Sequence, residues 1–220
     1  MGRLVLLCGA SGSGKTTVGE GLKQRGFAHF DGDAWMYGMD PVAQSGQVPS
    51  PEQMAACPEE IAQLREAYIQ KYWMRRAAGE PPEPSAMEAF YAAMCAAVLA
   101  RCDGDLVVSH AVLERRVRDL LREALPELVC VVLGVAEEVL VERKVRRLAA
   151  SAAAQGKTLE DFVLAYDGEG TAAERIDRLT RQSIAAEEAG ADEERTFTVA
   201  VGTEDTASVV GSVAACLGLA

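Results

Sequence analysis

The sequence has few of the residues that hold small or metal-dependent domains together. Its six cysteines form no C-x-x-C pair, and His29 and His110 are the only histidines. A structural zinc site is therefore not expected, because such a site needs four closely spaced Cys or His ligands. Scattered thiols are typical of a reducing compartment, where they pack as small hydrophobic side chains.

Positive charge is also scarce. The chain has 22 Lys and Arg against 33 Asp and Glu, for a net charge of -11, and no extended basic run offsets this. The composition excludes nucleic acid as a default partner, because phosphate backbones are bound by surplus cations. An acidic protein can still bind an anion where a few positive groups gather in one cleft.

Long apolar runs are missing as well. The apolar run near the N-terminus extends only from Leu4 to Cys8, too short for a signal-peptide core or a membrane span. We therefore expect a cytoplasmic protein with no membrane partner. With 220 residues, 49% hydrophobic and 25% charged, the composition is that of a globular chain, and we predict one domain over residues 1–220.

Short apolar runs alternate with helical patterns along the chain. The strand-like runs cover residues 4–8, 27–31, 106–109, 128–133 and 196–201, and the helical patterns cover 14–25, 112–124, 136–154, 171–189 and 204–217. Strands separated by helices build parallel sheets. We predict an α/β fold, a doubly wound five-stranded parallel sheet with the second strand beside the first.

Two segments interrupt the alternation. Residues 34–101 carry helical patterns only, and within them Ser85 and Glu88 have the spacing of a capping box. Residues 155–170 place a short helical piece between glycines. We predict a helical insertion over the first segment and a short mobile lid over the second.

A phosphate-binding motif follows the first predicted strand. Residues 9–16 match G-x-x-x-x-G-K-[ST] in full and open a predicted helix, which argues against an accidental Gly/Ser turn. In such a loop, backbone N–H groups surround the phosphates, Lys15 reaches the β and γ phosphates, and the Thr16 hydroxyl binds Mg²⁺. We predict that the loop binds Mg²⁺-ATP through Gly9, Ala10, Ser11, Gly12, Ser13, Gly14, Lys15, Thr16 and Thr17.

Two acids follow the second predicted strand. Asp31 and Asp33 lie two residues apart, so both carboxylates can face the cleft at the carboxyl edge of the sheet. An acidic surface turn has the same pattern. The third strand ends in Ser109-His110, with no acid of its own. We assign Asp33 as the catalytic base and Asp31 as a metal-site residue, although the spacing alone does not decide which acid is the base.

Several segments together resemble a known family. The phosphate loop followed by Phe30-Asp31-Gly32-Asp33, the block at 113–123 and the block at 139–147 are similar to small P-loop kinases of the gluconate and shikimate kinase type. The resemblance implies a P-loop NTPase-type fold with an acceptor-binding insertion, and phosphate-clamping arginines at Arg143 and Arg147, of which we take Arg143 as catalytic. The family's lysine before its double arginine is Glu114 here. We therefore expect the same reaction on an acceptor other than gluconate.

Two further residues are candidate acceptor contacts. His110 ends the third predicted strand, and Arg115 begins the next helix nearest the carboxyl edge. His110 could equally be a hydrogen-bonded structural histidine. Arg115 could hold a carboxylate or phosphate with two hydrogen bonds. For the later arginines of this helix, including Arg118, we expect a solvated face.

The combined expectation is an ATP-dependent phosphotransferase that acts on a hydroxyl of a small metabolite, such as a sugar acid, sugar or polyol. A nucleoside or nucleotide kinase is the first alternative, with Trp73, Arg75 and Arg76 of the insertion as base and phosphate contacts. An ATP-binding regulatory protein or a partner-stimulated ATPase is the second. The sequence allows a monomer or a homodimer.

Overall fold

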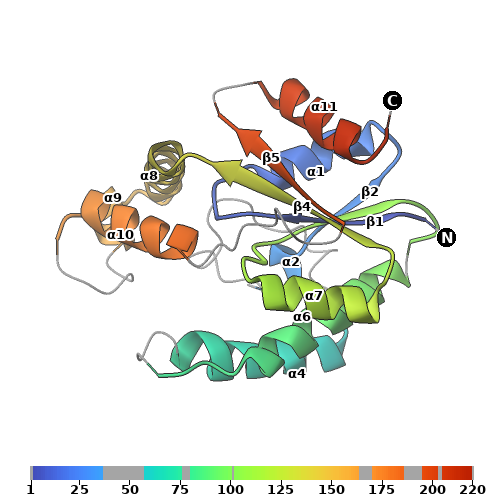
Figure 1. The fold of residues 1–220 in the computed structure, drawn as a ribbon. Coiled ribbons are helices and arrows are strands. Elements are labelled where there is room, and N and C mark those ends of the chain that lie inside the picture. Colours follow the sequence, from blue (N-terminus) through green and yellow to red (C-terminus); the bar gives the residue numbers. More distant parts are fainter. Residues whose placement is uncertain are drawn as a thin grey trace.

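The computed structural model describes residues 2–36, 57–75, 80–100, 102–163, 170–185, 195–202 and 205–219. A five-stranded, fully parallel sheet runs through them (Figure 1). The strands are β1 (Leu4–Cys8), β2 (Ala28–Asp31), β3 (Leu106–Ser109), β4 (Leu128–Val135) and β5 (Thr196–Val201). The predicted α/β fold of the P-loop NTPase type is confirmed.

The prediction that β2 lies beside β1 was wrong. The sheet order is β2-β3-β1-β4-β5, so β3 lies between the first two strands of the chain. Burial explains the order. Every residue of β1 and β3 is buried, which requires neighbours on both edges and helices on both faces, whereas β2 carries His29 and Asp31 and is only partly buried. The more polar strand therefore occupies the edge.

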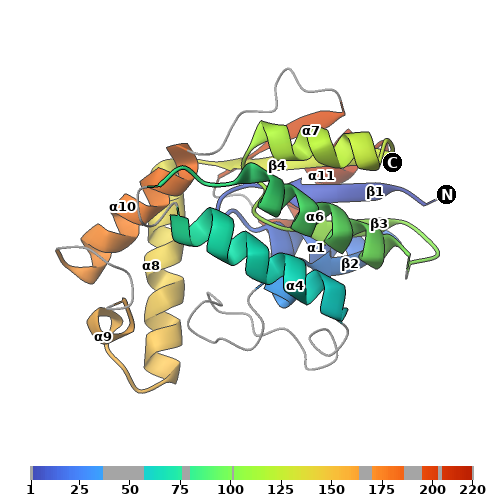
Figure 2. The ribbon, with the colours of Figure 1, turned by 90° about the horizontal axis from the view of Figure 1, so that it is seen from below.

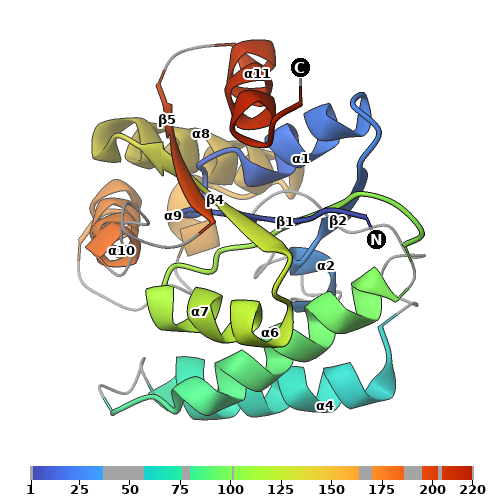
Figure 3. The same ribbon diagram turned by 45° about the vertical axis from the view of Figure 1, so that its right-hand side comes forward.

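Helices cover both faces of the sheet. α1 (Lys15–Lys23) and α11 (Thr206–Cys216) lie on one face, and α7 (Arg115–Ala124) and α6 (Pro84–Leu99) lie on the other, with α4 (Glu59–Tyr68) as an outer layer against α6 (Figures 1 and 3). Alternate residues of β1 supply the two resulting cores, because successive side chains of a strand point to opposite faces. No helix within the described ranges is both long and apolar enough to cross a membrane.

The cysteines of the sheet and of α6 behave as core side chains, as predicted. Cys8, Cys95 and Cys130 are fully buried in the core on the α6 and α7 face. Burial raises the pKa of Cys95 to about 12, and burial, with the neighbouring Cys130, raises the pKa of Cys8. Thiols held in the neutral form in this way are poor nucleophiles and poor metal ligands.

The predicted insertion is helical where it is described. α4 continues directly into a π-helical segment, η1 (Ile69–Met74), and α6 follows. The expected capping box at Ser85 and Glu88 was wrong, because α6 already begins at Pro84 and Glu88 instead pairs with Arg116 at 3.1 Å. Proline suits a first helical turn, where its missing N–H has no partner to lose. Residues 37–56, 76–79 and 101 of the predicted insertion lie outside the described residues.

A third group of helices lies beyond the carboxyl ends of the strands. It consists of α8 (Glu137–Ala154), α9 (Leu159–Val163) and α10 (Ala172–Ala185), which project to one side of the sheet in two views (Figures 1 and 2). These helices share a small apolar cluster of their own, made by Leu148, Ala152, Phe162, Val163, Ala172 and Ile176. α9 falls within the predicted lid, whose residues 164–169 lie outside the described part. Mobility of the lid stays a prediction.

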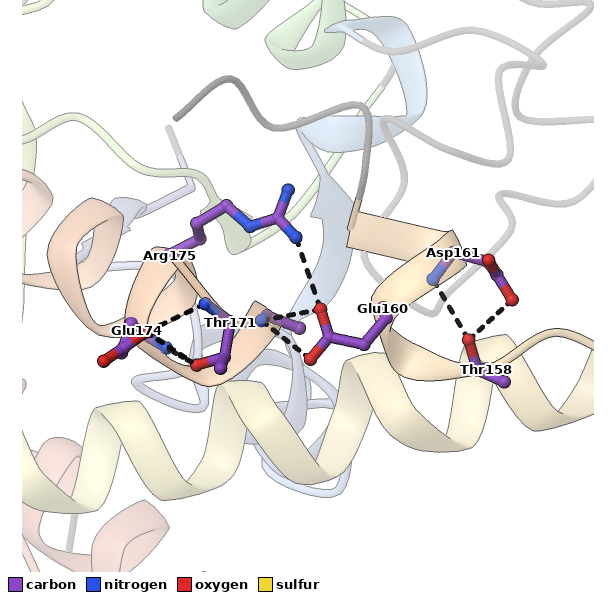
Figure 4. Close-up of polar contacts among 7 residues, drawn as sticks. Thr158, Glu160, Asp161, Thr171, Glu174 and Arg175 are labelled. Carbon is purple, nitrogen blue, oxygen red and sulfur yellow. Dashed lines mark hydrogen bonds and ion pairs between the residues drawn. The ribbon is translucent and has the colours of Figure 1, made fainter. Parts of the chain in front are cut away.

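Polar contacts tie α9 to α10 (Figure 4). The Glu160 carboxylate accepts from the Ala172 backbone N–H at 2.9 Å and from Arg175 Nη2 at 3.3 Å. At the start of α10, Thr171 and Glu174 exchange backbone-to-side-chain hydrogen bonds as a capping box. Together with the apolar cluster, these bonds make α8, α9 and α10 one packed unit.

Replacing Glu160 by alanine is expected to loosen this unit. Arg175 is only 7% exposed, so the substitution leaves a buried guanidinium without its carboxylate. Because Glu160 itself is exposed, we expect a loss of only about 1 kcal/mol in the free energy of unfolding, with faster amide hydrogen exchange at the start of α10. Glu142→Ala, an exposed acid on α8, serves as the control. Equal exchange in both variants would contradict the assignment.

Candidate active site

The loop after β1 is shaped by three glycines. Gly9, Gly12 and Gly14 have φ angles of 132°, 96° and 97°, a region that side chains other than glycine rarely adopt. At Gly9 there is also no room, because a Cβ atom would lie 2.8 Å from the Leu133 carbonyl oxygen. The loop therefore turns tightly against β4 and leads directly into α1.

Lys15 lies at the start of α1 and folds back over the loop. Its Nζ donates to the carbonyls of Gly9 at 2.9 Å and Ala10 at 3.0 Å. Burial lowers the pKa of Lys15, although Asp33 and Asp31 act in the opposite direction. The first turn of α1 contains no acidic residue. The helix N-terminus and Lys15 together form a positive site for an anion.

Strand register brings the two acids to the same edge as the loop. Asp31 is level with Ser109 of β3, and Ser109 is level with Leu7 of β1, two residues before the loop begins. The Thr16 hydroxyl donates to Asp31 Oδ2 at 2.8 Å. Asp31 Oδ1 in turn accepts from the Asp33 backbone N–H at 3.1 Å. The structure thus brings together the predicted metal-site residues.

Asp33 is paired with the histidine that ends β3. His110 is buried, and its Nδ1 lies 2.9 Å from Asp33 Oδ1, an ion-pair distance at which the ring is not aligned for a linear hydrogen bond. Gly32 is required beside this pair, because a Cβ there would lie 2.9 Å from the His110 ring. Burial by itself would raise the pKa of Asp33, but His110, with Lys15 and Arg147, lowers it overall. The carboxylate is therefore held ionised, as a proton acceptor must be.

The two predicted lid arginines reach different partners. Arg147 Nη2 donates to the Ser11 hydroxyl of the phosphate loop at 3.0 Å. Arg143 Nη2 donates to the Gly202 carbonyl, after β5, at 2.8 Å. Arg147 is therefore already at the loop, while a phosphate contact for Arg143 stays a prediction.

A comparison with protein-family models gives one match that covers most of the chain. A model described as an AAA domain matches residues 4–167, from β1 through the phosphate loop, the acids and α8. The chain belongs to this AAA domain family. A comparison with curated protein sequences finds no match.

Solved structures with the same fold include small-molecule kinases. A gluconokinase from Sinorhizobium meliloti 1021 has a TM-score of 0.56 at 24% identity, covering 99% of this chain and 91% of its own. A sugar kinase from Janibacter sp. HTCC2649 has 0.57 at 20%, covering 100% and 96%. A shikimate kinase from Bacteroides thetaiotaomicron has 0.53 at 13%, covering 99% of both chains. This AAA domain protein thus has the predicted P-loop fold, of the gluconate and shikimate kinase type.

The donor set at the edge of this AAA domain fits magnesium. Mg²⁺ prefers oxygen ligands and is commonly held by one or two protein oxygens together with nucleotide phosphates and water. The Thr16 hydroxyl and the Asp31 carboxylate, 2.8 Å apart, supply oxygens of this kind. Within the described ranges no cluster of three or more His, Cys, Asp or Glu could hold a metal ion. The set therefore suits a metal that is bound together with the nucleotide.

Two arginines of α7, Arg118 and Arg115, had been assigned an environment or a role from the sequence. Arg118 is not on a solvated face. It is fully buried, and its Nη1 donates to the carbonyls of Val112 at 3.2 Å and Leu113 at 2.8 Å, which fixes the loop between β3 and α7. Arg115 is half exposed, with its Nε 3.6 Å from Asp119. A substrate contact for Arg115 stays a prediction.

Sequence reasoning missed a line of aromatic contacts that leads from His110 into the insertion. The His110 ring lies 5.0 Å from the Tyr91 ring, and the Tyr91 hydroxyl lies 3.5 Å from the Tyr68 hydroxyl. The Tyr68 ring lies 5.5 Å from Tyr72, whose hydroxyl donates to Glu114. No single helical pattern signals this line, because its tyrosines come from α4, η1 and α6 and its two ends lie between β3 and α7. Through the His110–Asp33 pair, it connects Asp33 to Glu114.

Proposed function

We propose that the chain transfers the γ-phosphoryl group of ATP to a hydroxyl of a small, uncharged metabolite such as a sugar or polyol. The observation that carries the proposal is the position of Asp33. This ionised carboxylate stands at the same sheet edge as the phosphate loop and is held by the buried His110. An acid in that position suits removal of a proton from an attacking hydroxyl.

Each residue of the edge has a role in this reaction. The loop amides and Lys15 stabilise the charge on the β and γ phosphates, and Arg147 adds a second cation. Mg²⁺ bound with ATP supplies further neutralisation, and Thr16 and Asp31 are the residues that would hold it. The acceptor oxygen forms a bond to the γ phosphorus as the bond to the β-phosphate oxygen breaks. Asp33 takes the hydroxyl proton, and ADP leaves.

The charges on the acceptor side favour an uncharged acceptor over a sugar acid. Each cation of α7 and of the described insertion already contacts a protein acceptor: Arg65 the Trp35 carbonyl, Lys71 and Arg75 Glu83, Arg115 and Arg122 Asp119, Arg116 Glu88, and Arg118 two carbonyls. A bound carboxylate or phosphate would have to compete with these contacts. Glu114, in place of the lysine of gluconate kinases, would also repel it.

The structurally similar kinases support this acceptor class, and the contacts of Arg75 weaken the nucleotide-kinase alternative. Two structures with the same fold are named as a gluconokinase and a sugar kinase, which supports a hydroxylated, sugar-like acceptor. The nucleotide-kinase alternative relied on Trp73, Arg75 and Arg76. Arg75 lies 2.8 Å from Glu83 and 3.5 Å from Glu80, and Arg76 lies outside the described residues. Arg75 is therefore engaged by two acids, which makes this alternative the weaker one.

The test is ADP release from Mg²⁺-ATP with a panel of sugars, polyols, amino alcohols, sugar acids and nucleosides, with a control without acceptor. We expect turnover with a sugar or polyol and almost none in the control. Turnover only with nucleosides would replace the proposal by a nucleoside kinase. Turnover in the control alone would make the protein an ATPase, and ATP binding with no turnover would favour a regulatory protein.

A further inference from the structure

Lys144 is a charged residue in an otherwise apolar row of α8. Residues four apart share one face of a helix, and the row reads Leu140, Lys144, Leu148 and Ala152. The other three members are buried, and Lys144 itself is partly buried. The neighbouring Arg146, by contrast, is exposed. Lys144 is therefore directed inward, where a leucine or alanine would pack more favourably.

The inward direction leads to the phosphate loop. A Cβ atom built on Gly12 would lie 3.7 Å from the Leu140 side chain and 4.0 Å from Lys144 Cγ. One turn further along the helix, Arg147 donates to Ser11 of the same loop. This face of α8 therefore lies directly against residues 11 and 12, on which the nucleotide phosphates are expected.

The two charges that shift the pKa of Lys144 have the same sign as its own. Burial, together with the positive charges of Arg147 and Lys15, lowers the pKa of Lys144 to about 8. No carboxylate within the described ranges pairs with Lys144. Three cations around one loop repel one another. Asp33 and Asp31 offset part of this repulsion for Lys15, and Asp33 does so for Arg147, but neither acid pairs with Lys144. A bound anion is therefore expected to stabilise the arrangement.

We propose that Lys144 binds the phosphate chain of the nucleotide, as a third cation beside Lys15 and Arg147. The inference rests on nucleotide binding at the loop and is independent of the acceptor. It accounts for a lysine in an apolar row, for the close packing of α8 against Gly12 and for the absence of a protein counter-ion among the described residues. Binding residues that destabilise the unliganded protein are common at functional sites.

The first test measures nucleotide affinity by calorimetry in the full-length chain. Lys144→Gln is expected to weaken ATP binding about ten- to hundredfold, the size of a lost charge-assisted contact, and to leave weak adenosine binding unchanged. Arg146→Gln, which removes the same charge from the exposed face of the same helix, is the matched control. Unchanged ATP affinity in Lys144→Gln would overturn the proposal, as would an equal loss for ATP and adenosine.

The second test separates phosphate binding from a packing role. Without nucleotide, Lys144→Gln is expected to raise the melting temperature relative to Arg146→Gln, because repulsion from Arg147 and Lys15 is removed. Saturating ATP is expected to raise the melting temperature of Lys144→Gln by less than it raises that of wild type. Lys144→Arg should recover most of the affinity. A lowered melting temperature without nucleotide, combined with normal stabilisation by ATP, would show a structural lysine instead.

A third test asks whether Lys144 recognises the phosphates or another part of the nucleotide, and it does not depend on the proposed kinase reaction. Tripolyphosphate is expected to compete with ATP in wild type and to bind less tightly to Lys144→Gln, which shows that the phosphates and not the base are recognised. Tripolyphosphate affinity equal in the two proteins would contradict the proposal. Failure of every acceptor in the turnover panel would overturn the kinase reaction and leave these binding results standing.

Discussion

Replacing Lys15 by alanine is expected to lower kcat about a thousandfold and to weaken ATP binding. Lys15 lies over the phosphate loop, where its two hydrogen bonds to loop carbonyls can be exchanged for contacts with the β and γ phosphates. Negative charge builds up on these phosphates as the transition state forms, and a preorganised cation in a water-poor site stabilises it strongly. The measurement is ADP release at saturating acceptor, with ATP affinity measured in parallel.

Lys23→Ala provides the matched control for this prediction. Lys23 lies in the last turn of the same helix, α1, where it pairs with Glu20 at 2.9 Å and is 52% exposed. Loss of an exposed pair of this kind changes stability little, so turnover in this variant is expected to be close to that of wild type. If Lys15→Ala turned over normally, the loop would not be the site of phosphoryl transfer.

The fold could be predicted from local patterns because its strands differ so strongly from its helices. The inner strands β1, β3 and β4 are short apolar runs, and their burial on both faces favours a parallel sheet. Strand order was less accessible. It depends on which strand best tolerates an edge, and the polar residues His29 and Asp31 of β2 were not used to predict that β2 lies at the edge.

The site was predictable where its residues are adjacent in sequence or end strands. The phosphate loop is a contiguous motif with glycines at positions 9, 12 and 14. Asp31 ends a strand and Asp33 comes two residues later, so their place at the same edge as the loop follows from a parallel sheet. The contact of His110 with Asp33 depends on β3 lying beside β2, which the sequence did not reveal. Lys144 also has a signal in the sequence, because it is a charge four residues from each of two leucines, but that these leucines are buried against the loop follows only from the structure.

Asp33→Asn is expected to lower kcat by about 10² to 10⁴, the range for loss of a general base, while ATP affinity changes little. Asparagine keeps the size of the side chain but cannot take the hydroxyl proton. Asp103→Asn, an exposed acid in the turn before β3, is the control. The measurement is kcat in the presence of the acceptor, with ATP binding followed separately. Unchanged turnover would remove Asp33 from the mechanism and leave Asp31 as the remaining acid at the edge.

The pH dependence gives a second, independent check on Asp33. Its pKa lies below the ordinary value of 3.8 in the folded protein, so the carboxylate stays ionised down to that range and gives kcat/KM no acid limb above it. The ionised form also stabilises the folded state above the unfolded pKa, and this contribution is lost as the pH falls through the folded value. In His110→Asn the lowering by His110 is removed, while burial still raises the pKa. The acid limb of kcat/KM should therefore move to higher pH, and an unmoved limb would show that His110 does not act through Asp33.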